Sequence, residues 1–147
     1  MIFNHVLSKI FSREIDFLND IFYCRLVHVA QPNTISLCSQ ISQEASGGNY
    51  APQPIIGNRI ITTVGNSAYL TSLGSAEFLA LQIAGGNLVG LVVCKRLGLT
   101  FSSNDQAILY IPFPNSANSP NGLFKPDASD LILSLTNSNG IIKIIGS

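Results

Sequence analysis

Charged side chains are scarce in this sequence. Asp, Glu, Lys and Arg together make up 11% of its 147 residues, whereas an ordinary soluble domain carries about 25%. Between residues 26 and 94 the charged side chains are Glu44, Arg59 and Glu77. Free monomers usually rely on surface charge to stay apart, and they rarely expose large apolar patches. The scarcity of charge therefore indicates a protein that is built into an assembly.

An excess of either sign of charge is also missing, because eight basic residues balance eight acidic ones. Without a basic field, the chain lacks the long-range attraction that draws proteins to nucleic acids or anionic lipids. No stretch reaches the ~18 uncharged apolar residues of a membrane-spanning helix. Charges at Lys9, Arg13 and Glu14 interrupt the first residues, so we expect no secretory signal. Nucleic acid and membrane are not expected partners.

Tryptophan is absent, and cysteine occurs only at Cys24, Cys38 and Cys94. An odd number of widely spaced cysteines does not suit a framework of disulfides, so we interpret them as buried free thiols in a reducing compartment. Cys24 and His28 could begin a zinc site, but the other cysteines and histidines supply no paired short spacing to complete four ligands. No Ser-His-Asp or Cys-His set with an orienting group stands out. The sequence predicts no catalytic residues, no cofactor and no metal.

Apolar side chains recur at helical spacing near the N-terminus. This spacing predicts a helical segment over residues 1–21, formed by one helix or by two, with Ser12 able to cap the second. The apolar positions extend further around the helix than one core-facing stripe requires. Packing on the chain's own domain is one interpretation. The other is an attachment surface, whose candidate interface residues are Phe3, Ile10, Phe11 and Phe17.

From residue 22 onward the sequence is typical of β-structure. Short runs of β-branched and aromatic residues recur about every ten residues, separated by turns rich in Gly, Asn, Ser and Pro. No alternation of strands with helices is present. We therefore predict one domain over residues 1–147 of the mainly β class. Its fold would be an antiparallel β-sandwich or jelly-roll-like structure over residues 22–147, behind a short helical N-terminus.

Two β-hairpins are predicted within this domain. Glycine and asparagine in a short loop supply the positive φ angles that a tight hairpin turn needs. Such loops separate residues 76–84 from 88–97, and residues 131–136 from 141–145. Both pairs of apolar runs are expected to lie side by side as neighbouring strands.

A distinctive order of segments runs along most of the chain. A strand ending near Pro32 is followed by a Gly-Gly-x-Tyr-Ala-x-Gln-Pro loop, a glycine-rich turn and an apolar C-terminal element. These comprise Gly47, Gly48, Tyr50, Ala51, Gln53 and Pro54, then Gly85, Gly86, Asn87 and Leu88, then Phe124, Pro126, Ala128 and Leu131. The order resembles small β-rich virion proteins of tailed bacteriophages. Pro52 replaces the arginine of that pattern and its later tryptophan is missing, which leaves capsid cement, tail-fibre adaptor and minor tail component as open roles.

The resemblance implies a non-enzymatic virion structural protein, first of all a capsid cement or decoration protein that stabilises neighbouring shell subunits. A tail or tail-fibre adaptor component is the alternative within the same class. The implied partners are further copies of the chain, expected as a trimer, and other virion proteins such as the major capsid protein or tail proteins. The location would be the virion, after synthesis in host cytoplasm. A carbohydrate-binding β-sandwich that uses Tyr50, Tyr69 or Tyr110 is the alternative of a different class.

Overall fold

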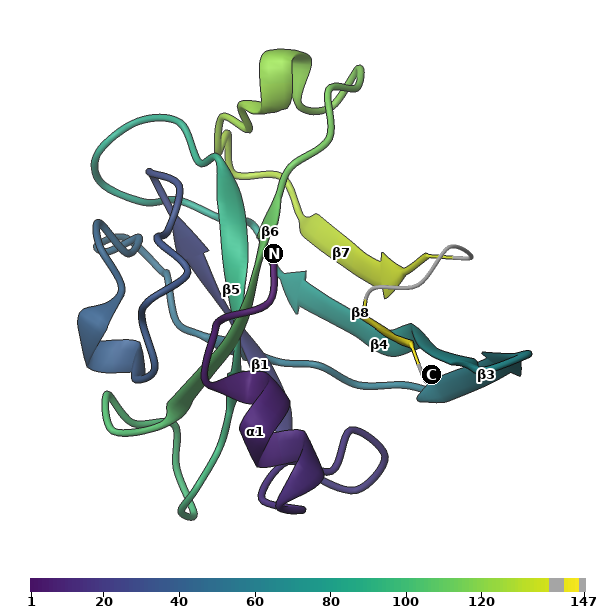
Figure 1. Ribbon diagram of the computed structural model, residues 1–147. Coiled ribbons are helices and arrows are strands. Elements are labelled where there is room, and N and C mark those ends of the chain that lie inside the picture. The colour runs from purple at the N-terminus through teal and green to yellow at the C-terminus, as the bar shows by residue number, and fades with distance from the viewer. Residues whose placement is uncertain (138–141, 146–147) are drawn as a thin grey trace.

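Two antiparallel sheets form the framework of the computed structural model, which describes residues 1–137 and 142–145 (Figure 1). The first sheet has the order β2-β1-β5-β6, formed by Gln53–Pro54, Phe22–Val27, Gly90–Lys95 and Gln106–Pro112. The second has the order β3-β4-β7, with β8 also paired to β4; these strands are Ile60–Val64, Ser67–Phe78, Leu131–Thr136 and Ile142–Ile145. The helix α1 spans Val6–Phe11, and the short 3-10 turns η1 and η2 span Cys38–Gln40 and Pro120–Gly122. The predicted mainly β fold with a short N-terminal helix is confirmed, and the architecture is consistent with a β-sandwich.

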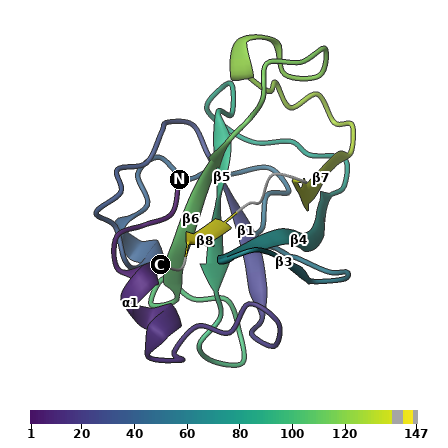
Figure 2. The ribbon, with the colours of Figure 1, turned by 45° about the vertical axis from the view of Figure 1, so that its right-hand side comes forward.

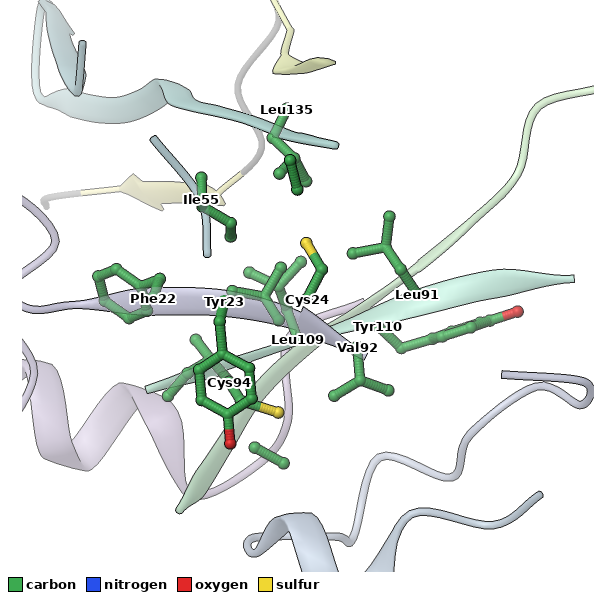
Figure 3. Packing of buried hydrophobic residues seen from close by; sticks show 14 of the residues in the cluster. Phe22, Tyr23, Cys24, Ile55, Leu91, Val92, Cys94, Leu109, Tyr110 and Leu135 are labelled. Carbon is green, nitrogen blue, oxygen red and sulfur yellow. The ribbon is translucent and has the colours of Figure 1, made fainter. Parts of the chain in front are cut away.

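The core is built on both faces of the first sheet. The central strands β1 and β5 are buried almost throughout, so their side chains are apolar in near-continuous runs and do not alternate with polar ones. Cys24 and Leu91 point toward the second sheet, where Ile55 and Leu135 meet them (Figure 3). Tyr23 and other side chains of the sheet point the opposite way, toward α1 and η1 (Figure 3). Each face therefore needs its own cover.

The strand β4 carries the second sheet away from this core. Its C-terminal half contributes buried Leu73, Ala76 and Phe78, while its N-terminal half forms a hairpin with β3 that projects from the body (Figure 1, Figure 2). Gly74 marks the change, because its φ is +106° and an added Cβ would lie 2.4 Å from the carbonyl oxygen of Ile56. Only glycine accommodates both the backbone angle and this close approach. We call the projecting β3–β4 hairpin the arm.

The predicted hairpin of residues 76–84 with 88–97 is wrong. The first run ends in β4 of one sheet, and the second contains β5 of the other. Gly85 and Gly86 do adopt positive φ angles, but they lie on a crossover in which buried Leu81 and Leu88 anchor the chain to the core. Positive φ angles allow a sharp turn without determining which strands pair.

The predicted hairpin of residues 131–136 with 141–145 is also wrong. β7 and β8 both pair with the same side of β4, β7 along Ser72–Phe78 and β8 along Ser67–Leu70. The amide of Asn137 continues this ladder by donating to the carbonyl of Thr71. β7 and β8 are thus successive parts of one interrupted strand. The rest of the predicted turn lies outside the described residues.

The helical segment predicted over residues 1–21 is only partly present, because the helix ends at Phe11. Arg13 adopts a left-handed backbone conformation with φ 63°. Beyond it the Asp16 carboxylate accepts hydrogen bonds from the amides of Leu18 and Asn19, and the Asp20 carboxylate accepts one from the amide of Asp16. Aspartate side chains that bond nearby amides compete with helical hydrogen bonds. Residues 12–20 therefore form turns, and no second helix begins at Ser12.

The exposures of Phe3 and Phe11 predict effects of very different size for the same substitution. Phe3 is fully buried and Phe11 is 77% exposed. Phe3→Ala should lower the free energy of unfolding by about 3–5 kcal/mol, because it leaves a cavity in the core. Phe11→Ala should change it by less than about 0.5 kcal/mol. Urea unfolding followed by circular dichroism measures both, and similar losses for the two variants would contradict the packing described here.

Candidate interaction surface

The strand β3 is exposed along its whole length. It forms the edge of the second sheet, and in the part of the chain that the structure describes it pairs only with β4. Ile60, Ile61 and Val64 expose 48%, 46% and 65% of their surface, and two threonines complete a strand without charge. An exposed, apolar edge strand presents free backbone groups with which another strand can pair. We call Ile60–Val64 the β3 edge.

A groove of about 310 Å³ adjoins the β3 edge. One wall of the groove is formed by Ile10, Phe17 and Leu18 of the N-terminal segment. The other wall is formed by Ile61 and Leu70 of the arm. Leu18 is half exposed at 51%, so apolar surface continues from the groove onto its rim. Arg13 and Asp16 also line the groove. The groove and the β3 edge together form one largely apolar surface that joins residues far apart in the sequence.

The four predicted interface residues do not share one surface. Phe3 is completely buried and Phe17 is 9% exposed, so both belong mainly to the chain's own core. Their prediction as interface residues is therefore corrected. Ile10 is half-buried against the core and lines the groove together with one side of Phe17. Phe11 points into solvent. Because the helix stops after six residues, it cannot present the second apolar face that a longer helix would have had.

Arg59 fastens the N-terminal segment to the start of the arm. Its guanidinium donates hydrogen bonds to the carbonyl oxygens of Phe17, at 3.1 Å, and Asp20. It also lies over the ring of Phe22, 5.0 Å from the centroid, a favourable cation–π geometry. Burial lowers the pKa of Arg59, and the negative charges of Asp20 and Asp16 oppose that shift. These contacts fix the width of the groove.

Lys95 holds the same segment from the other side. Its ammonium group lies 2.9 Å from the Asp20 carboxylate and also donates to the carbonyl oxygen of Glu14. Lys95 ends β5, directly opposite Phe22 in the sheet. The turns after α1 are therefore tied to β5 by Lys95 and to the start of the arm by Arg59, and these two cations place the groove wall without a regular helix.

A buried polar cluster lies apart from this surface. Arg25 binds the Glu44 carboxylate at 2.9 Å, and Glu44 accepts a hydrogen bond from the Tyr50 hydroxyl at 3.0 Å. The Tyr23 hydroxyl donates to Asp105 at 2.7 Å. Burial and the Glu44 charge raise the pKa of Tyr50, and burial raises that of Tyr23. Both phenols therefore stay protonated at neutral pH and act as hydrogen-bond donors to the buried carboxylate of Asp105 and the partly buried carboxylate of Glu44.

Sequence reasoning did not find this cluster or the role of Arg59. The available signal was rarity, since Glu44 and Arg59 are two of the three charged residues between positions 26 and 94. A charged residue in an otherwise uncharged stretch often has a structural role, because a charged side chain that is removed from water needs a partner. The β3 edge had no comparable signal, because an edge position is defined by which strands pair.

The three tyrosines proposed for sugar binding do not form one platform. Tyr110 is buried in β6. Tyr50 stacks on Phe78 with ring centroids 6.1 Å apart, and its hydroxyl is engaged by Glu44. Tyr69 belongs to β4, in the other sheet from Tyr110.

Among the described residues, no group of three His, Cys, Asp or Glu side chains is placed to hold a metal ion. Within the same part of the chain, no helix has the length and apolar character needed to cross a membrane. Comparisons with protein-family models, curated proteins and solved structures find no match to this chain.

Replacing Arg59 should loosen the groove. Arg59→Ala removes two charge-assisted hydrogen bonds and the contact with Phe22, so we expect a loss of about 1–3 kcal/mol in the free energy of unfolding. The amides of residues 16–20 should also exchange faster with deuterium. Lys125→Ala removes the same charge at an exposed position and is the matched control. Unchanged exchange at residues 16–20 in Arg59→Ala would contradict the anchoring role.

Proposed function

We propose that this chain is a non-enzymatic structural protein of a tailed-phage virion, in first place a capsid cement or decoration protein that binds neighbouring shell subunits. The observation that carries the proposal is the β3 edge, an uncharged and fully exposed strand at the border of a sheet. Such a strand forms backbone hydrogen bonds when it adds to a sheet of another chain. The resemblance of the segment order to phage virion proteins supports a virion as the assembly.

The apolar side chains of this surface favour association. Fully burying one large aliphatic side chain contributes roughly 1.5–3 kcal/mol. Ile60, Ile61 and Val64 of the β3 edge expose 48%, 46% and 65% of their surface, so each can contribute about half to two thirds of that amount. Their sum has to exceed the loss of translational and rotational freedom on binding, which is estimated at about 4–15 kcal/mol. The groove beside the edge, with Ile10 and Leu18, supplies further area.

The absence of charge on the β3 edge favours the same role. An interface that removes charges from water loses several kcal/mol per ion unless each is paired, and the β3 edge contains no charged residue. The partners we propose are further copies of the chain, as a homo-oligomer expected to be a trimer, and other virion proteins such as the major capsid protein. A tail or tail-fibre adaptor would use the same surface.

Charging the β3 edge should separate the oligomer. We expect the wild-type protein to form a trimer or a larger species at micromolar concentrations in multi-angle light scattering. Lysine on an edge strand opposes pairing with another chain, so the double variant Ile60→Lys/Val64→Lys should be monomeric with an unchanged circular dichroism spectrum.

The control for this experiment is Leu97→Lys/Leu99→Lys. It introduces the same two charges at side chains that are 57% and 93% exposed outside the arm, and it should keep the oligomer intact. A monomeric wild-type protein would contradict the proposal. Equal dissociation of both double variants would assign the effect to overall charge and remove the β3 edge as the interface.

The virion role is tested separately. Particles of the phage whose genome encodes this chain are purified and analysed by mass spectrometry. Quantification against the major capsid protein gives the copy number per particle. Many copies support a shell protein, while a handful would move the assignment to the tail. Absence from intact particles would overturn the virion proposal even if the oligomer exists.

A further inference from the structure

Two of the three thiols meet in the core. The Sγ atoms of Cys38 and Cys94 lie 2.7 Å apart, although the residues are 56 positions apart in the chain. A disulfide bond has a length of about 2.05 Å, so a small movement would bring these sulfurs to bonding distance. The predicted burial of the three thiols is confirmed, but their wide spacing in the sequence gave no sign that two of them meet.

The pairing of strands explains how the two thiols meet. Cys94 of β5 lies opposite Tyr23 of β1, and directly opposed residues of antiparallel strands project to the same face. Cys38 begins η1, and its amide donates to the carbonyl oxygen of Asp105 at 2.8 Å, beside the edge strand β6. The loop that contains Cys38 is thereby fastened over the face on which Cys94 lies.

Cys24 is excluded from this pair by the alternation of side chains along β1. It neighbours Tyr23 in sequence and points to the opposite face of the sheet, away from Cys94 (Figure 3). It is fully buried, and burial raises its pKa. Cys24 is therefore a natural internal control, being a buried thiol without a thiol neighbour on its own face.

The surroundings make the two paired thiols unequal. The Tyr23 hydroxyl lies 3.7 Å from Sγ of Cys38. Hydrogen bonding with Cys94 lowers the pKa of the Cys38 thiol, with smaller contributions from Tyr23 and the Arg25 charge, while burial opposes them. Burial raises the pKa of Cys94. Because the thiolate is the nucleophile in thiol chemistry, Cys38 is the member of the pair suited to react first.

We propose that Cys38 and Cys94 form a redox modification site that closes to an intramolecular disulfide when the protein meets a hydroperoxide. The Cys38 thiol ionises, its thiolate attacks a peroxide oxygen, and the O–O bond breaks. The released hydroxide combines with the proton that Cys38 gave up and leaves as water. The resulting Cys38 sulfenic acid is attacked by the Cys94 sulfur, and the S–O bond breaks. The leaving hydroxide takes the Cys94 proton and forms a second water. Two thiols lose two electrons, and hydrogen peroxide gains them.

Access to the site depends on its less buried member. Cys38 is 4% exposed, whereas Cys94 is completely covered. Cys38 sits in a 3-10 turn of three residues, which backbone hydrogen bonds join to Ser103 and Asp105, and Cys38 becomes accessible when this turn opens locally without global unfolding. A molecule as small as hydrogen peroxide can enter through this opening, after which Cys94 completes the bond from inside.

Trypsin places the three cysteines on three separate peptides, which makes the proposal directly testable. Cleavage after Arg13, Arg25, Arg59 and Lys95 yields residues 14–25 with Cys24, 26–59 with Cys38 and 60–95 with Cys94. The native protein is treated with hydrogen peroxide, unfolded with an alkylating reagent present, and digested. We expect a linked 26–59/60–95 peptide that dithiothreitol separates, with alkylatable thiols falling from the three of the reduced protein to one.

The controls separate geometry from general reactivity. Cys24→Ala should still form the linked peptide, whereas Cys38→Ala and Cys94→Ala should form none. When the protein is oxidised in denaturant, disulfides between any two of the three cysteines should appear. The wild-type result does not depend on the folding of any variant. Three reactive thiols after peroxide treatment of the native protein, or a link that includes Cys24, would overturn the proposal.

Discussion

The burial of both faces of the β1–β5 pair is the constraint on which the rest of the structure depends. Six consecutive residue pairs, from Phe22↔Lys95 to Val27↔Gly90, form this ladder. Burying both faces of a sheet requires two covers, and the chain supplies the second sheet on one face and the N-terminal segment with η1 on the other. A short helix is enough for the second cover, because Arg59 and Lys95 hold the turns that follow it. The polar atoms enclosed on that face must then be satisfied internally, as Tyr23 and Asp105 are.

This constraint also explains where the few charges are used. The ion pairs Arg25–Glu44 and Lys95–Asp20 join loops to the central strands, and their side chains are between 12% and 25% exposed. Charges that are engaged in such joints do little to repel another molecule. The outer surface is consequently poorer in free charge than the composition alone suggests, and the arm has none along β3. Because the few charges are engaged in joining loops to the core, little charge is left to oppose association at the arm.

Local features could be predicted from the sequence, whereas pairing could not. The composition of residues 22–30 predicts a strand, and β1 is found there. Gly85 and Gly86 have the predicted positive φ angles. The residues of a turn do not determine in which sheet the next strand is buried. That choice depends on side chains such as Leu81 and Leu88, whose positions in the core are set by contacts distant in sequence. The meeting of Cys38 with Cys94 follows from the same distant pairing and was equally hidden.

The β3 edge shows the largest gap between local pattern and final environment. Its sequence Ile-Ile-Thr-Thr-Val has the composition of a central strand, yet every residue is exposed. Long apolar edges usually lead to open-ended aggregation. Here the ladder with β4 is shifted between Ile60 and Ile61, and such an irregularity bends a strand and increases its twist. An added strand could therefore pair in register only along residues 61–64. A short, bent edge of this kind favours closed association with a defined partner over continuous growth.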